Sequence, residues 1–146
     1  LYLRELFQGE EGAPPPIDLE AERRNGNLVR SEIQSGAIVA CHDLSDGGLL
    51  VGLAEMALAG NCGLTIDYSS DLADHAWYFG EDQARYLCVT ESPDALLTAA
   101  AKANVSAVVL GVTGGDTLNL PDGITIYISD LRKLHEGWLP DYMAGA

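Results

Sequence analysis

A polar turn between two apolar segments constrains the fold more than any other feature of the sequence. The segment AIVAC (37–41) is an unbroken apolar run, which is typical of a strand covered on both faces. It is followed by HDLSDGG and then by residues 49–59, which are apolar at almost every position and predict a helix covered on most sides. A strand followed at once by such a helix predicts a domain that contains both a sheet and helices.

The rest of the chain alternates between helical and strand patterns. Two short apolar strands flank a turn made of Pro121, Asp122 and Gly123, which predicts a hairpin. We therefore predict an α/β (α+β) fold, with helices packed on a mixed β-sheet in an α-β-α layered arrangement. The predicted helices span residues 19–35, 49–59, 72–77, 93–103 and 130–139, and the predicted strands span residues 37–41, 63–68, 85–90, 105–112, 117–120 and 124–128.

Composition and charge restrict the class of protein. With 146 residues, of which 47% are apolar and 21% charged, the chain is typical of one folded domain. Its 22 acidic and eight basic residues give a formal net charge of −14, which repels a nucleic-acid backbone, so we expect no nucleic-acid partner. The apolar runs are too short for a membrane-spanning helix of about 20 residues, so we expect no membrane partner. The three cysteines lack a C-x-x-C spacing and indicate reduced thiols in a cytoplasmic protein, with no zinc site.

The turn HDLSDGG is the first candidate for a functional site. Asp43 and Asp46 lie three residues apart between a predicted strand and a predicted helix, where open α/β sheets usually bind ligands. Gly47 and Gly48 leave backbone N–H groups uncovered at the positive end of the helix, an arrangement that suits a phosphate carried with Mg²⁺. The alternative is structural: Asp46 caps the helix, the glycines permit a tight turn, and His42 with Asp43 satisfies backbone groups.

The segment FGEDQARY (79–86) is the second candidate. Glu81 and Asp82 could act as an acid and a base or bind a metal ion, although adjacent residues entering a strand point to opposite faces. The alternative is that one of these two carboxylates pairs with Arg85, while Gly80 turns the chain into the strand. Glu55, alone on the apolar helix, is another candidate partner for Arg85. The sequence has no nucleophile elbow, Walker loop or dinucleotide fingerprint, so the residues alone identify no catalytic constellation.

Together with PPPIDLEAERRNGNLVRSEIQSG (14–36), these two motifs resemble the C-terminal part of the phosphoribosylformylglycinamidine synthase family (large subunit, PurL), in the aminoimidazole ribonucleotide synthetase-like superfamily. The resemblance extends from Tyr2 to the region of Trp138, with the blocks in the same order. It implies an ATP-dependent ligase of purine biosynthesis, which converts formylglycinamide ribonucleotide, ATP and glutamine-derived ammonia to formylglycinamidine ribonucleotide, ADP and phosphate. The fold that it implies is again an α-β-α arrangement with a mixed sheet.

By this resemblance the chain is a piece of a longer polypeptide, in which each of two ATP-handling domains is followed by a companion domain. Residues 1–16, which include QGEEGAPPP, are expected to be a linker from an upstream ATP-handling domain, and residues 17–146 the second, C-terminal companion domain. The family's catalytic histidine, nucleotide-contacting lysine and most Mg²⁺ ligands belong to segments upstream of Leu1. We therefore expect no catalytic or metal-binding residue in this chain, which should require no cofactor itself, whereas the full-length enzyme uses ATP and Mg²⁺.

The resemblance also implies a role for the polar turn. We expect it to line the cleft between a companion domain and an ATP-handling domain without making bonds, and this copy to line the second, non-catalytic cleft. The expected lining residues are His42, Asp43, Ser45, Asp46, Gly47, Gly48 and Glu81. The expected partners are the upstream domains of the same chain, a glutamine amidotransferase subunit and a small accessory subunit, and the isolated chain should be inactive. Two alternatives stay open: another ATP-using enzyme, of the selenophosphate synthetase or thiamine-monophosphate kinase type, and a non-enzymatic scaffold module.

Overall fold

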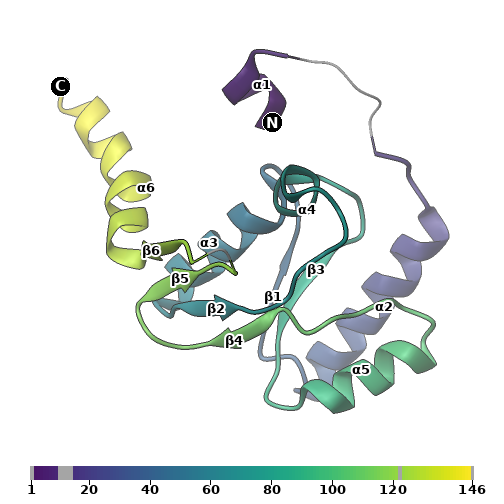
Figure 1. Cartoon of the computed structure of the whole chain (residues 1–146). Helices are drawn as coiled ribbons and strands as arrows, with labels where there is room; N and C mark the ends of the chain where they lie inside the picture. Colours follow the sequence, from purple (N-terminus) through teal and green to yellow (C-terminus); the bar gives the residue numbers. More distant parts are fainter. Residues whose placement is uncertain (1, 10–14, 122, 146) are drawn as a thin grey trace. The chain divides into compact units, whose positions relative to one another are not determined.

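The computed structural model describes residues 2–9, 15–121 and 123–145 and contains both helices and a mixed sheet, which confirms the predicted α+β class (Figure 1). Its elements are α1 (Tyr2–Phe7), α2 (Leu19–Ser35), β1 (Ala40–Asp43), α3 (Gly48–Gly60), β2 (Leu64–Ile66), α4 (Asp74–Phe79), β3 (Tyr86–Val89), α5 (Pro93–Lys102), β4 (Gly111–Thr113), β5 (Thr117–Asn119), β6 (Thr125–Tyr127) and α6 (Ile128–Met143). They form two compact units. Unit 1 is built from the described residues of 1–52 and 70–109, and unit 2 from those of 53–69 and 110–146.

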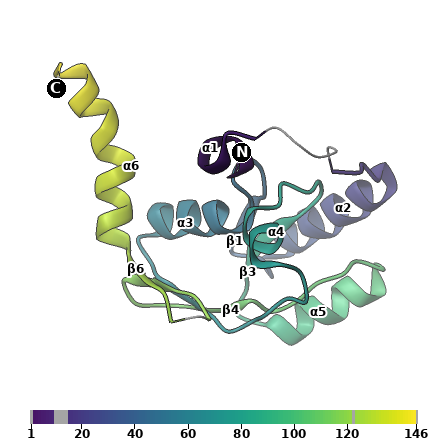
Figure 2. The same ribbon diagram turned by 45° about the horizontal axis from the view of Figure 1, so that its top comes forward.

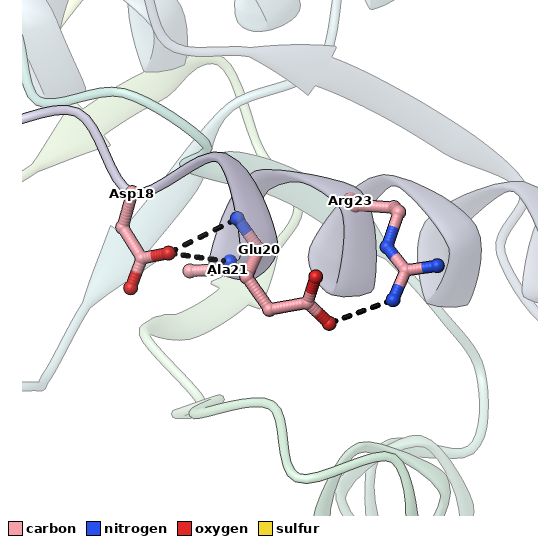
Figure 3. A network of polar contacts seen from close by, with 4 residues as sticks. All are labelled: Asp18, Glu20, Ala21 and Arg23. Carbon is pink, nitrogen blue, oxygen red and sulfur yellow. Dashed lines mark hydrogen bonds and ion pairs between the residues drawn. The ribbon is translucent and has the colours of Figure 1, made fainter.

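Helix α2 of unit 1 has a side-chain cap at its start. One carboxylate oxygen of Asp18 accepts hydrogen bonds from the backbone N–H groups of Glu20 and Ala21, each at 3.0 Å (Figure 3). Glu20 lies in the first turn, where the helix dipole favours an acidic side chain, and accepts a hydrogen bond from Arg23 at 2.7 Å. Gly36 ends the helix in the left-handed conformation, with a φ of 81°. The structure thus confirms both predicted ends of this helix.

Strands β1 and β3 form a two-stranded antiparallel sheet in unit 1. The register of this sheet places Cys41 directly opposite Cys88. Helix α2 contacts the residues just before β3. The side-chain amide of Asn25 donates a hydrogen bond to the carbonyl oxygen of Ala84 at 2.9 Å. The same helix also contacts α5. Within unit 1, helix α2 therefore helps to hold the start of β3 in place.

The strand predicted over 37–41 is shifted, and the expectation that it is covered on both faces is wrong. Strand β1 begins at Ala40, whose side chain is exposed, and the side chain of Val39 is 62% exposed. Only Ile38 of the predicted strand is buried. In the part of the chain that the structure describes, β1 has a single neighbouring strand, so an apolar run alone did not indicate how much cover it receives.

Helix α3 confirms the helix predicted over 49–59, and most of its positions are buried or half-buried. Leu49, Leu53 and Ala57 are buried at a spacing of four residues, which places them on one face. Val51 and Glu55, by contrast, are exposed. The exposed positions within 49–59 lie along one stripe of the helix, so the expectation of cover on most sides is confirmed.

Unit 2 contains a four-stranded mixed sheet in the order β4-β2-β5-β6. Strand β2 pairs antiparallel with β4 and parallel with β5, whereas β5 and β6 pair antiparallel and confirm the predicted hairpin. Of the predicted turn, Asp122 lies outside the described residues. The register places Leu118 beside Leu64, and Leu118 is only 1% exposed, so it lies at the centre of the core of unit 2. The buried core residues of this unit are Leu53, Ala57, Leu64, Ile66, Leu118 and Ile128.

Most of the strand predicted over 105–112 is absent from the described chain, where β4 covers only its last two positions and Thr113. The backbone N–H of Val105 donates a hydrogen bond to the carbonyl oxygen of Ala100 at 2.9 Å, at the end of α5. Val108 and Val109 are exposed. The β-branched residues of this segment favour a strand only where a neighbouring strand provides hydrogen bonds and packing.

Helix α6 is longer than the helix predicted over 130–139 and includes Pro140. Figure 2 shows it leaving the end of β6 and extending away from the sheet of unit 2. Leu134, Trp138 and Tyr142 follow one another at four-residue spacing and are all exposed, and the rings of Trp138 and Tyr142 stack with centroids 5.3 Å apart. Helices α4 and α5 lie within two residues of their predicted bounds. Among the described helices, none combines the length and the apolar character needed to cross a bilayer.

Candidate functional site

The candidate site lies in unit 1, where the turn after β1 meets the segment before β3. The backbone N–H of Leu44 donates a hydrogen bond to the carbonyl oxygen of Arg85 at 2.9 Å. The backbone N–H of Gly47 donates another to Oε1 of Glu81 at 3.0 Å. The two segments that the sequence singled out separately, HDLSDGG and FGEDQARY, are thus in direct contact.

The two glycines of the turn are required by the backbone geometry. Gly47 and Gly48 have φ values of 83° and 68°, which residues with a side chain rarely adopt. A Cβ atom on Gly48 would lie 2.7 Å from the carbonyl oxygen of Gly80 and 2.8 Å from the carbonyl carbon of Phe79. Both glycines are buried, so the turn and the segment before β3 pack backbone against backbone.

Glu81 accepts a hydrogen bond from one of the backbone N–H groups that we expected to be available to a phosphate. The hydrogen bond from the N–H of Gly47 lowers the pKa of the Glu81 carboxyl group below its ordinary value of 4.5. At neutral pH a carboxylate is therefore held beside the start of α3, where the positive end of the helix favours it. A phosphate at this place would have to displace that carboxylate or tolerate its charge. The residues present do not fit a phosphate group here.

The remaining polar side chains of the turn lie at its surface. Asp43, Ser45 and Asp46 are exposed, whereas His42 is half-buried, with Nδ1 within hydrogen-bonding distance of the carbonyl oxygen of Asp43. Glu81, rather than Asp46, accepts a hydrogen bond at the start of α3, so the structural alternative in which Asp46 caps this helix is not supported. Within the described ranges, no three His, Cys, Asp or Glu residues come together in a way that could hold a metal ion.

Arg85 fixes the segment before β3. Its Nη1 atom donates hydrogen bonds to the carbonyl oxygen of Gly80 at 3.3 Å and to Oδ2 of Asp82 at 3.5 Å. Its guanidinium carbon lies 5.4 Å from the ring centroid of Trp77. The structural alternative for this segment is therefore confirmed for Asp82, which pairs with Arg85, whereas Glu81 contacts the other segment. Trp77 was not singled out from the sequence, because its distance along the chain from Arg85 matches no local spacing rule.

Tyr2 of α1 also contacts the segment before β3. Its ring stacks on that of Phe79, with centroids 4.5 Å apart, and lies 6.5 Å from the ring of His75. Helix α1 thus packs within unit 1, although it belongs to the span 1–16 for which a linker is expected. The sequence did not indicate this contact, since aromatic contacts between distant segments leave no periodic signal.

Comparison with known sequences gives a family match and close relatives. Residues 1–120 match the family described as AIR synthase related protein, C-terminal domain. Phosphoribosylformylglycinamidine synthase subunit PurL of Acidiphilium cryptum is 53% identical over 145 residues, and PurL of Rhodopseudomonas palustris (strain HaA2) is 52% identical over 149 residues. Each alignment covers 99% of this chain and 20% of the relative. The chain thus spans about a fifth of the length of the curated relatives that it matches.

Solved structures from Thermotoga maritima have a similar fold. PurL complexed with FGAR has a TM-score of 0.70 at 16% identity, with 85% of this chain and 23% of that chain covered. PurL complexed with ATP has a TM-score of 0.65 at 16% identity, with 75% and 21% covered. The PurLQS structure has a TM-score of 0.67 at 21% identity, with 79% and 22% covered. At these identities the likeness establishes the fold alone.

Proposed function

Because the chain belongs to the AIR synthase related protein, C-terminal domain, family, we propose that it is the C-terminal companion domain of a phosphoribosylformylglycinamidine synthase. The observation that carries this proposal is the 53% identity to a PurL subunit over 99% of the chain. In the full-length protein, formylglycinamide ribonucleotide, ATP and ammonia from glutamine give formylglycinamidine ribonucleotide, ADP and phosphate. Residues 17–146 form the companion domain, and residues 1–16 lead from an upstream ATP-handling domain.

Within that protein, the polar turn lines a cleft and takes no part in making or breaking covalent bonds of the reactants. The support for this role is the contrast between a backbone fixed by Gly47, Gly48 and Glu81 and the exposed side chains of Asp43, Ser45 and Asp46. The helix start is occupied by a carboxylate, and the described residues bring no three metal-binding side chains together. We propose that this domain contributes shape and polar surface, whereas ATP, Mg²⁺ and the reacting groups are held by the rest of the full-length protein. The lining residues are His42, Asp43, Ser45, Asp46, Gly47, Gly48 and Glu81.

The full-length protein works in a cytoplasmic assembly with a glutamine amidotransferase subunit and a small accessory subunit. The Thermotoga maritima structures of PurLQS and of PurL complexed with ATP support association with other subunits and the use of ATP. Relatives named PurL at about half identity favour this activity over a selenophosphate synthetase or thiamine-monophosphate kinase. The following experiment distinguishes the proposed enzyme domain from a non-enzymatic scaffold module.

A chimera tests the proposal. This chain replaces the matching segment of Acidiphilium cryptum PurL, and release of ADP is measured with formylglycinamide ribonucleotide, ammonia, ATP and Mg²⁺, with the parent PurL as the positive control. We expect turnover by the chimera and none by the 146-residue chain alone. A chimera that folds but does not turn over would contradict the assignment, and substrate-dependent ATP consumption by the isolated chain would contradict the division of roles.

The lining role is tested in the same chimera. The variant Asp46→Asn should lower kcat by less than about tenfold, because loss of a group that transfers a proton typically costs about 10²-fold or more. A crystal structure of the chimera soaked with Mg-ADP gives an independent answer. If every ligand lies far from the seven lining residues, the lining role is rejected even where the activity is retained.

A further inference from the structure

Two of the three cysteines face each other across the sheet of unit 1. The register of β1 and β3 pairs Cys41 with Cys88, and their Sγ atoms lie 3.8 Å apart, within hydrogen-bonding distance for sulfur. Both side chains are half-buried, so a small reagent has partial access to them. Cys62 belongs to unit 2 and is exposed. The pair is therefore a cluster of nucleophilic groups that the proposed function does not use.

The position of the pair in the ladder suits a covalent bond. The backbone N–H of Leu44 bonds the carbonyl oxygen of Arg85, which marks a hydrogen-bonded position just beyond the last paired residues, Asp43 and Tyr86. Hydrogen-bonded and non-hydrogen-bonded pairs alternate along an antiparallel ladder, so Cys41 and Cys88 form a non-hydrogen-bonded pair. In such pairs the Cα atoms lie about 4.5 Å apart, inside the range of about 4.4–6.8 Å found in disulfides. The sulfur atoms, which lie 3.8 Å apart, must approach to about 2.0 Å for a bond to form.

We propose that Cys41 and Cys88 form a reversible disulfide by exchange with a low-molecular-weight disulfide such as oxidised glutathione. The thiolate of Cys41 attacks one sulfur of the reagent, which forms a mixed disulfide and releases one reagent thiol. The thiolate of Cys88 then attacks the sulfur of Cys41, which forms the cross-strand bond and releases the second reagent thiol. The protein loses two electrons and two protons, and the reagent takes up both.

The surroundings of the two thiols set the order of attack. Burial is the largest effect on each, and it raises the pKa of Cys41 above 9.0 and that of Cys88 from 9.0 to about 12. Cys41 therefore carries the larger thiolate fraction and reacts first, and both react more slowly than an exposed thiol at neutral pH. The disulfide would join β1 and β3 next to the two segments HDLSDGG and FGEDQARY, which contact each other. This inference depends on the geometry of unit 1 and not on the proposed function.

The experiment uses the full chain with Cys62→Ser, which leaves two thiols. The folded protein is incubated with oxidised glutathione at mildly alkaline pH, denatured in acid, labelled with a maleimide and mapped by peptide mass spectrometry. We expect the free thiols to fall from two to none, with the peptides of Cys41 and Cys88 joined. With Cys88→Ser added, Cys41 should retain one glutathione, and with Cys41→Ser added, modification of Cys88 should be at least about tenfold slower.

The unmodified chain provides the matched control, because its Cys62 should take up glutathione without joining either partner. A urea-denatured sample shows that the reagent is active. Two thiols that persist in the folded protein but react when it is denatured would overturn the proposal. Separate glutathione adducts on Cys41 and Cys88, with no bond between them, would overturn it as well.

Discussion

At the scale of single residues, Gly48 sets how closely the turn after β1 can approach the segment before β3. Its φ of 68° already disfavours a side chain, and a Cβ atom on this residue would lie 2.7 Å from the carbonyl oxygen of Gly80. We expect Gly48→Ala to lower the free energy of unfolding by about 2–4 kcal/mol, because both the backbone strain and the clash oppose it. Urea denaturation followed by circular dichroism measures this loss.

The matched control is Gly137→Ala in α6. Apart from its chain neighbours and the backbone of α6 itself, no heavy atom lies within 4 Å of a Cβ at that position, and α6 continues on both sides of it. This variant should raise the free energy of unfolding by up to about 1 kcal/mol, because alanine favours a helix interior over glycine. Equal effects of the two substitutions would contradict the account of the turn.

Glu81 provides a second test at this scale. Glu81→Gln removes the charge from the hydrogen bond with the N–H of Gly47 and should cost about 1 kcal/mol in unfolding free energy. Because the folded-state pKa of Glu81 lies below 4.5, its contribution is present above that pH and is lost as the pH falls through the lowered pKa. Urea midpoints at neutral and acidic pH measure both effects. Asp82→Asn should cost less, because the ion pair of Asp82 with Arg85 is long and the Asp82 side chain is exposed.

The sequence identified the residues of the candidate site but not their pairing. HDLSDGG and FGEDQARY were both singled out, since a turn after a strand and adjacent carboxylates are local signals. The bond between Gly47 and Glu81 joins residues 34 positions apart. It depends on the register of β1 with β3, which no local pattern specifies.

At the scale of elements, the sequence correctly predicted those features of helices and strands that depend on residues close together in the chain. The bounds of the helix predicted over 19–35 and the β5–β6 hairpin are set by nearby residues, such as the cap at Asp18 and the left-handed Gly36, and both are as expected. The segments 37–41 and 105–112 were misjudged because the extent of a strand depends on its neighbours. The sequence also predicted one sheet, and it carried no signal that the strands would divide between two.

The β1–β3 ladder gives a prediction for alkaline pH. The pKa of Cys88 is raised from 9.0 to about 12 in the folded state, so the thiol contributes stability that is complete below pH 9.0 and is lost as the pH rises toward 12. The urea midpoint should therefore fall more steeply between about pH 8 and pH 10.5 in the parent chain than in Cys88→Val. Cys62→Val, an exposed position outside the ladder, should leave the parent slope unchanged. Parallel slopes in all three proteins would contradict this prediction.

At the scale of the whole molecule, apolar residues are divided between a buried core and exposed surface on α6. Leu118 is 1% exposed, whereas Trp138 is 65% exposed. We expect Leu118→Ala to cost about 2–5 kcal/mol in unfolding free energy, as for other buried leucines, and Trp138→Ala less than about 0.5 kcal/mol. Thermal and urea denaturation of the two variants measure the difference. A cost for Trp138→Ala similar to that for Leu118→Ala would show that α6 is covered in solution.

The division of unit 2 between residues 53–69 and 110–146 affects how the chain matures on the ribosome. Strand β2 is synthesised long before β4 and β5, between which it lies in the sheet, whereas β1 and β3 are both complete by Val89. At about 5–20 residues per second, β2 waits for several seconds with both edges open. Slowing translation after residue 69 lengthens that interval, and with it the time in which a chaperone or a neighbouring nascent chain can capture the strand.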